Sequence, residues 1–236
     1  GALFLKMKIR NLHISYNKNK IISNLDFDVH HGAINGLVGM NGAGKTTLLN
    51  AIFGLKEVDS GSIEQNGVPV LTTEIAYLET TNFFYPKIKA QEYLEFFKLA
   101  NPGFNIEKWN AVFELPLNKI VDDFSTGMKK KLAFMAVIAL NRPILILDEP
   151  FNGVDLESNE KLKLIIKKLK ESGKTVLITS HILETLTSIC DYISVLYEGK
   201  IHLSAEREDF NQIESYLKNS IAENAQEKID NIFNEK

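Results

Sequence analysis

The stretch Gly39–Thr47 reads GMNGAGKTT and matches the pattern G-x-x-x-x-G-K-[ST] at every fixed position. The apolar residues Leu37 and Val38 stand before it, as at the end of a buried strand, and Thr47–Gly54 after it has the pattern of a helix that ends at a glycine. Glycines in such a loop let the backbone turn tightly and point its N–H groups at phosphate oxygens, beside the positive end of the helix dipole. The strand, loop and helix together predict a nucleoside triphosphate site, the alternative being a plain glycine-rich turn.

A pair of acids sharpens this prediction. The apolar run Ile144–Leu147 has the pattern of a parallel strand covered on both faces, and it ends at Asp148 and Glu149. In the chemistry of such sites Lys45 meets the β- and γ-phosphates, while Thr46 and Asp148 hold Mg²⁺. Glu149 is then placed to polarise a water for attack on the γ-phosphate, unless the two acids merely cap the following turn. The pair therefore favours hydrolysis over phosphoryl transfer to a small substrate.

Composition and charge limit the class of protein without excluding nucleic-acid binding. The chain has 236 residues, of which 44% are hydrophobic and 24% charged, with a net charge of −3. These values are ordinary for a globular protein with a core and give no general attraction to nucleic acid or anionic lipid. The single cysteine, Cys190, allows no internal disulfide and is predicted to be buried. The longest apolar run, Leu132–Leu140, is too short to span a bilayer, and neither a signal peptide nor a membrane helix is expected.

Alternating strand and helix patterns predict an α/β fold with a largely parallel sheet, a small antiparallel β subdomain and a helical insertion. Asn66-Gly67 is a strong hairpin signal between two of the strands. The strands are expected at Lys8–Ile14, Leu25–Val29, Ala33–Val38, Ser62–Gln65, Val68–Leu71, Ile75–Leu78, Ile144–Leu147, Thr175–Thr179, Tyr192–Tyr197 and Lys200–Leu203. The helices are expected at Thr47–Gly54, within residues 86–140, and at Glu157–Glu171 and Ile182–Cys190.

Further motifs carry a family resemblance. Phe124–Met128 reads FSTGM just before a long helical pattern and resembles the signature sequence of ATP-binding-cassette (ABC) proteins, usually LSGGQ, in the variant of bacterial exporters. Gly153–Asp155 is similar to the D-loop of that family, His181 to its switch histidine and Tyr16 to its adenine-stacking aromatic residue. The resemblance covers about residues 7–203. It implies a P-loop NTPase core of the ABC type over residues 7–204, with a helical subdomain over about residues 86–140.

The resemblance also implies roles for single residues. Tyr16 would stack on the adenine, and His181 would contact the γ-phosphate and hold the attacking water with Glu149. The implied catalytic residues are Glu149, His181 and Lys45. Ser125, Gly127 and Asp155 would act on the nucleotide of a second, head-to-tail copy, so that ATP binding closes a dimer. The implied cofactors are ATP and Mg²⁺. The remaining residues that would contact the nucleotide belong to the loop: Asn41, Gly42, Ala43, Gly44, Thr46 and Thr47.

The implied partners are a separately encoded transmembrane permease and either an identical or a sister ATPase subunit. The protein would then be cytoplasmic and peripheral on the inner face of the cell membrane. Phe83–Tyr85 is an aromatic cluster suited either to a permease helix or to ordinary packing between subdomains. Residues 205–236 read as an accessory helix or a frayed tail. No direct contact with nucleic acid is expected, because Lys129–Lys131 is predicted to be a short solvated face.

Two other functions stay open, and the sequence differs from the usual ABC motifs at a few positions. A soluble ABC ATPase acting on nucleic acid or the ribosome is the alternative, and a non-catalytic nucleotide-gated module is a third. A GTPase is disfavoured because Asn118–Val121 reads NKIV and lacks the aspartate of N-K-x-D. The signature carries Thr126 and Met128 in place of glycine and glutamine. The Q-loop glutamine is replaced by Glu79 or Thr80, and Thr80 is the better match and a candidate ligand for the metal.

Overall fold

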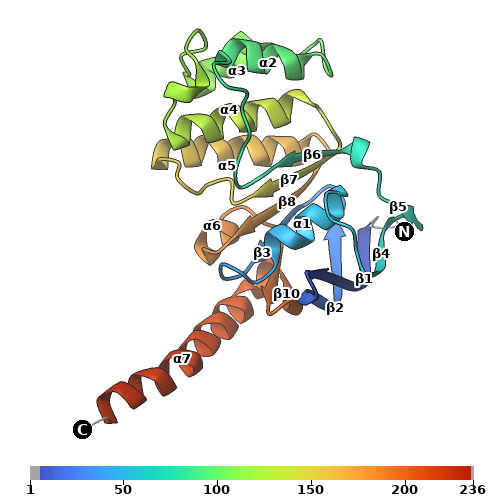
Figure 1. Cartoon of the computed structure of the whole chain (residues 1–236), viewed down its shortest axis with the longest axis vertical. Helices are drawn as coiled ribbons and strands as arrows, with labels where there is room; N and C mark the ends of the chain where they lie inside the picture. Colours follow the sequence, from blue (N-terminus) through green and yellow to red (C-terminus); the bar gives the residue numbers. More distant parts are fainter. Residues whose placement is uncertain (1–5, 235–236) are drawn as a thin grey trace.

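The computed structural model describes residues 6–234 and contains two sheets, the larger of which is six-stranded with the order β10-β9-β3-β8-β7-β6 (Figure 1). Strands β6, β7, β8, β3 and β9 are parallel, and only β10 is antiparallel to its neighbour β9. The strands are Ile34–Val38 (β3), Ile75–Leu78 (β6), Ile144–Asp148 (β7), Thr175–Ser180 (β8), Tyr192–Tyr197 (β9) and Lys200–Glu206 (β10). The predicted α/β fold with a largely parallel sheet is confirmed.

The smaller sheet is antiparallel and has the order β2-β1-β4-β5. It consists of Lys6–Tyr16 (β1), Asn19–His30 (β2), Ser60–Gln65 (β4) and Val68–Pro69 (β5). The predicted hairpin at Asn66-Gly67 is present, and both turn residues have positive φ angles of 56° and 77°. The strand expected at Val68–Leu71 is wrong in length, since β5 ends at Pro69, whose nitrogen cannot donate a ladder hydrogen bond.

Helices surround the larger sheet, and α2, α3 and α4 gather at one end of the molecule (Figure 1). The helix expected at Ile182–Cys190 is shorter than predicted and ends at Thr187. The helix α7 follows β10 and extends away from the body (Figure 1). No helix within residues 6–234 is both long and apolar enough to cross a bilayer. The α-helices are Lys45–Phe53 (α1), Ala90–Lys98 (α2), Ile106–Phe113 (α3), Thr126–Ala139 (α4), Leu156–Glu171 (α5), Leu183–Thr187 (α6) and Phe210–Asn234 (α7), with short 3₁₀ turns at Thr72–Glu74, Val121–Asp123 and Arg207–Asp209.

Strand β7 explains why its sequence is continuously apolar. Successive strand residues point to opposite faces of a sheet. Leu145 and Leu147 belong to the core shared with α4 and α5, whereas Ile144 and Ile146 belong to the core shared with α1 and the antiparallel sheet. Because both faces are covered, all five residues of β7 are buried. This double burial fixes the strand on which the two acids stand.

The parallel strands end at one common edge of the sheet. Val38 of β3 lies opposite Ser180 of β8, and Asp148 of β7 lies opposite Thr179. The segments that leave these strands are the glycine-rich loop, the residue Glu149 and the residue His181. Parallel pairing therefore gathers segments that are far apart in sequence at the carboxyl edge, where open α/β sheets bind ligands.

The turn between β9 and β10 supports the glycine-rich loop. The Gly199 N–H donates to the carbonyl oxygen of Ala43 at 3.2 Å, and the Gly199 oxygen accepts from the Ser23 N–H at 3.2 Å. Gly199 has a φ of +72°, and a Cβ at this position would overlap the carbonyl oxygen of Ile21. The turn thus needs both the left-handed conformation and the absence of a side chain.

Replacement of Gly199 by alanine is therefore expected to destabilise the protein. The left-handed conformation of Ala costs roughly 1–2 kcal/mol, and overlap with a backbone atom adds roughly 1–3 kcal/mol. Gly67→Ala is the matched control, since Gly67 has a similar φ of +77° but no atom within 4 Å of the added Cβ. Urea unfolding should show a clearly larger loss of unfolding free energy for Gly199→Ala, and equal losses in the two variants would contradict the packing argument.

Candidate nucleotide-binding and catalytic site

The glycine-rich loop borders a cavity of about 330 Å³ at the carboxyl edge of the larger sheet. Gly42 and Gly44 have φ angles of +84° and +106°, which glycine adopts without strain. Helix α1 begins directly after the loop, so its unpaired N–H groups face the cavity. The lining residues are Ile21, Met40, Asn41, Gly42, Gly44, Lys45, Thr46, Thr47, Thr80, Asp148 and Glu149. Ile21 is the one lining residue on β2, and the motifs gave no signal for it.

Lys45 is buried at the base of this cavity and is 7% exposed. Its ammonium donates to the carbonyl oxygens of Gly39 and Met40 and lies 3.4 Å from Oε1 of Glu149. The carboxylate of Glu149 is also nearly buried, with 11% of its side chain exposed. The two charges that the sequence assigns to phosphate binding and to water activation thus form an ion pair with each other.

Asp148 is fully buried and collects three hydroxyl groups. Its Oδ2 accepts from Thr46 at 2.7 Å and from Thr80 at 2.6 Å, and its Oδ1 accepts from Thr179 at 2.5 Å. A carboxylate with two adjacent hydroxyls is a set of hard oxygen donors of the kind that Mg²⁺ prefers. The residues therefore fit the predicted metal, with Thr46, Thr80 and Asp148 as the group that would hold it. Thr80, and not Glu79, lines the cavity.

Thr179 is a site residue that the motifs did not reveal. Its hydroxyl donates to Asp148 and accepts from the backbone N–H of Glu149 at 2.9 Å. It thereby orients both acids from the neighbouring strand β8. A possible signal was the polar ending of an otherwise apolar strand, but its partner could be named only once β7 and β8 were known to be adjacent.

Glu149 and His181 form the second half of the site. The ring Nδ1 of His181 lies 3.1 Å from each carboxylate oxygen of Glu149. This distance lies within hydrogen-bond reach, and since an ionised carboxylate only accepts, a hydrogen bond here requires the proton on Nδ1. Glu149 has a φ of +50°, which directs its side chain from the end of β7 toward both Lys45 and His181. A carboxylate held in this way can accept a proton from a water in the cavity.

Lys130 overturns one prediction. The cluster Lys129–Lys131 was expected to be a solvated face, yet Lys130 is only 5% exposed. Its ammonium donates to the backbone carbonyls of Glu149 at 3.1 Å and Thr80 at 3.4 Å. The charge faces inward because Lys130 lies on the side of α4 that packs on the sheet, on the same face as Phe134 four residues later.

The residues expected to act across a dimer lie outside the cavity. Ser125 is the N-cap of α4 and accepts from the N–H of Met128 at 3.2 Å, and Asp155 is the N-cap of α5 and accepts from the N–H of Ser158 at 2.9 Å. This backbone hydrogen bond lowers the pKa of Asp155. A Cβ on Gly127 would lie 3.0 Å from the carbonyl oxygen of Gly153, so the signature turn packs directly on the D-loop.

Tyr16 also stands apart from the cavity. It ends β1, is 42% exposed, and the ammonium of Lys56 lies 4.3 Å from the centre of its ring. A cation over an aromatic face is attracted by the ring quadrupole. The ring face that the resemblance assigns to adenine is therefore in contact with Lys56 in this conformation.

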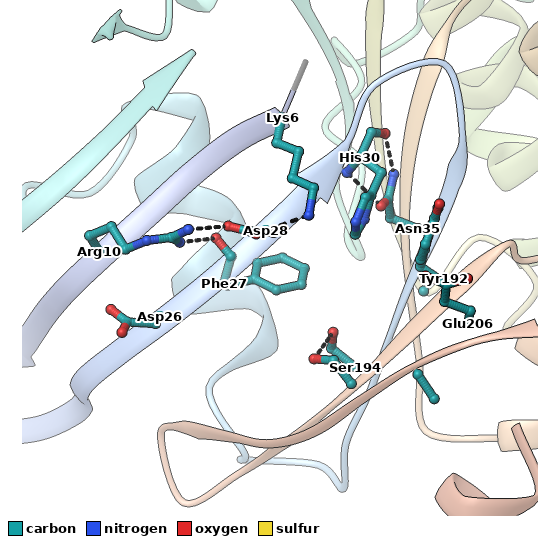
Figure 2. A pocket seen from close by; sticks show the side chains of 13 residues that line it. Lys6, Arg10, Asp26, Phe27, Asp28, His30, Asn35, Tyr192, Ser194 and Glu206 are labelled. Carbon is teal, nitrogen blue, oxygen red and sulfur yellow. Dashed lines mark hydrogen bonds and ion pairs between the residues drawn. The ribbon is translucent and has the colours of Figure 1, made fainter. Parts of the chain in front are cut away.

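A larger cavity of about 480 Å³ lies on another side of the molecule, between β1 and β2 and the β9–β10 hairpin (Figure 2). Its two cations, Lys6 and Arg10, are both paired with Asp28, at 3.4 and 2.6 Å. The rings of His30 and Tyr192 stack at 3.6 Å on the opposite wall (Figure 2). With both of these cations paired with Asp28 and no N-terminus of an α-helix among the described lining residues, this cavity lacks the features of a triphosphate site.

Comparisons with known proteins agree with this geometry. A family model described as ABC transporter matches residues 22–152, more than half of the chain, and a model described as an AAA domain, putative AbiEii toxin, matches residues 120–187. An uncharacterized ABC transporter ATP-binding protein of Methanocaldococcus jannaschii is 34% identical over 222 residues, which cover 90% of this chain and 82% of the relative. A lantibiotic transport ATP-binding protein of Streptococcus pyogenes is 33% identical over 225 residues, covering 91% and 97%.

The fold has close counterparts among solved structures. A structure described as the ATP binding subunit of an ABC transporter matches with a TM-score of 0.79 at 27% identity, covering 89% of this chain and 93% of the other. The glycine-rich loop, the buried strand that ends in two acids and these similarities agree. The chain belongs to the ATP-binding subunits of ABC transporters, a family of ATPases.

Proposed function

We propose that this protein hydrolyses ATP to drive a membrane transporter of the exporter type. The observation that carries the proposal is the convergence of Lys45, Asp148 and Glu149 on the cavity beside the glycine-rich loop, with His181 in contact with Glu149. A phosphate site, an oxygen donor set for a divalent cation and a held carboxylate are the components of phosphoryl transfer to water. The transport role rests on family membership and on the printed name of the Streptococcus pyogenes relative.

Each side chain has a defined task in this reaction. The N–H groups of the loop and of the first turn of α1 bind the phosphate oxygens, and Lys45 places its charge on the β- and γ-phosphates. Bound Mg²⁺, held by Thr46 and Asp148 with Thr80 beside them, would neutralise phosphate charge. Glu149 accepts the proton of the attacking water, and His181 orients that carboxylate through the 3.1 Å contact.

The same proposal includes a head-to-tail dimer of two identical or sister subunits. Ser125 and Thr126 are exposed at the N-terminus of α4, and Ser125 caps the helix without lining the cavity of its own chain. A helix N-terminus is an anion-binding site, so this turn is suited to the γ-phosphate held by a second copy. Tyr16 would meet the adenine once Lys56 leaves its ring.

A permease partner is proposed to dock beside the helical insertion, on the cytoplasmic side of the membrane. Phe83 and Tyr85 are 71% and 63% exposed, and their rings meet edge to face at 5.3 Å. Phe84 between them is anchored against Tyr93 of α2 at 4.9 Å. Exposed aromatic side chains on a fixed segment are typical anchors of protein interfaces.

The dimer can be tested with a substitution that preserves the helix cap. Ser125→Asp retains a good N-cap but places a negative charge against the phosphate of the second copy. Like charges at an interface are strongly unfavourable, so ATP-dependent dimerisation of a Glu149→Gln protein should weaken by at least about tenfold. Light scattering with and without ATP measures this, with thermal stability expected to stay unchanged.

The matched control is Asn105→Asp at the N-cap of α3, where the side chain accepts from the Lys108 N–H at 2.9 Å. It introduces the same acidic cap on another helix and should leave ATP-dependent dimerisation intact. Equal dimerisation of the Ser125→Asp and Asn105→Asp proteins would refute the proposed placement of the signature turn.

A further inference from the structure

Lys130 is a buried cation that the proposed mechanism does not use. It lies near the start of α4, two residues after the last signature residue Met128, and its ammonium ends between two segments of the site. The acceptors are backbone carbonyls, one of Glu149 at 3.1 Å and one of Thr80 at 3.4 Å. One side chain therefore joins the signature helix to the proposed base and to the loop beside the metal position.

The burial of the Lys130 ammonium costs free energy unless its surroundings compensate. A buried ammonium is unfavourable unless acceptors or opposite charges surround it. Burial lowers the pKa of Lys130, and the nearby carboxylates of Asp148 and Glu149 oppose that shift. A lysine that served only as a surface solubiliser would extend into water, as its flexible stem permits.

The peptide groups around Glu149 show what the lysine constrains. Glu149 has the left-handed φ of +50°, an uncommon conformation for a residue with a Cβ. Its N–H is held by the Thr179 hydroxyl at 2.9 Å, and its carbonyl is held by Lys130. Clamping the residue at both ends directs the carboxylate into the cavity, where it meets Lys45 and His181. Conformations of this kind persist at functional sites when the surroundings determine them.

The second contact of Lys130 completes the connection. The carbonyl oxygen of Thr80 accepts from Lys130, and the hydroxyl of Thr80 donates to Oδ2 of Asp148. We propose that Lys130 is a positioning residue for ATP hydrolysis, which anchors the Glu149 backbone to α4 and so makes the placement of the base depend on the position of the signature helix. This inference rests on the proposed ATPase function. It concerns the orientation of the Glu149 carboxylate and not the binding of the nucleotide.

A double-substitution experiment tests it. Lys130→Met removes the charge but keeps a long apolar stem, and misplacement of a reacting group by about 1 Å can lower a rate by around 10²-fold. We expect kcat for ATP to fall roughly 10- to 100-fold, with the ATP dissociation constant changed less than about twofold. Lys130→Arg should recover part of kcat, because a guanidinium can still donate to the carbonyls. Lys129→Met on the same helix is the control and should keep the wild-type kcat.

A double-mutant cycle that combines Lys130→Met with Glu149→Gln separates a positioning effect from a general loss of structure. If Lys130 acts through Glu149, Lys130→Met in a Glu149→Gln background should lower the residual hydrolysis by no more than about twofold. The proposal is overturned if the Lys130→Met protein keeps its kcat, or if its loss is equally large without the base. A rise in the ATP dissociation constant matching the loss of kcat would also overturn it.

A readout that needs no hydrolysis keeps this inference distinct from the proposed function. In the nucleotide-free protein, hydrogen exchange of the backbone around residues 149–152 should be faster in Lys130→Met than in Lys129→Met. If the wild-type protein hydrolyses no ATP while this difference is present, the ATPase proposal fails and the anchoring of Glu149 by Lys130 stands. Equal exchange in the two variants would overturn the anchoring.

Discussion

Replacing Glu149 by glutamine is expected to lower ATP hydrolysis by about 10²–10⁴-fold, the range for loss of a general base. The amide keeps the size of the side chain and can still bond to His181, so nucleotide binding should persist. Because the bound ATP is no longer consumed, the variant should accumulate as an ATP-dependent dimer. Phosphate release and light scattering, measured on the same preparation, check both parts.

The control for this prediction is Glu160→Gln on α5, where an exposed glutamate pairs with Lys163 on the solvent side of the helix. It should hydrolyse ATP at the wild-type rate, since the loss of a surface ion pair is worth at most about 1 kcal/mol of stability. If Glu149→Gln retained wild-type turnover, another group would have to accept the proton, and the catalytic assignment would be wrong.

Replacing Lys45 by alanine is expected to weaken ATP binding, the step before hydrolysis, as well as hydrolysis itself. A hydrogen bond to a charged group contributes roughly 1.5–3 kcal/mol, so ATP affinity should fall about 10- to 100-fold. The same ammonium stabilises charge that develops in the transition state, and loss of one such donor lowers kcat by a further factor of about 10²–10³. Calorimetric titration with a non-hydrolysable ATP analogue, followed by steady-state kinetics, separates the two effects.

The two substitutions should therefore differ in kind. Both remove the ion pair between Lys45 and Glu149, but only Lys45→Ala should weaken nucleotide binding. Lys163→Ala on α5 serves as a control for loss of a lysine outside the cavity and should leave affinity unchanged. An ATP affinity of Lys45→Ala within threefold of wild type would contradict the assignment of this lysine to the phosphates.

The parts of the site that follow from local sequence could be predicted. The glycine-rich loop is defined by nine consecutive residues, and the apolar run of β7 is continuous because both of its faces are covered. Neither feature needs knowledge of distant partners. The end of β7 could therefore be assigned as the place of the two acids from the residues alone.

The parts that depend on tertiary neighbours could not. Thr179 is one hydroxyl at the end of an apolar strand, and its contact with Asp148 exists only because β8 pairs with β7. Lys130 lies between two other lysines, and a run of three lysines is typical of a helix face exposed to solvent. Helical spacing was the missed signal, since Lys130 shares its side of the helix with Phe134 and Val137, both of which are buried.

The contact between Lys45 and Glu149 has a consequence for the order of events in a catalytic cycle. If Lys45 binds the triphosphate as proposed, one ammonium has two anionic partners, the carboxylate of Glu149 and the γ-phosphate, and they compete for it. Binding of ATP would then free from its ion pair the carboxylate that acts on the attacking water. Under this proposal the proton acceptor and the γ-phosphate become available to that water together, which disfavours activation of water without substrate.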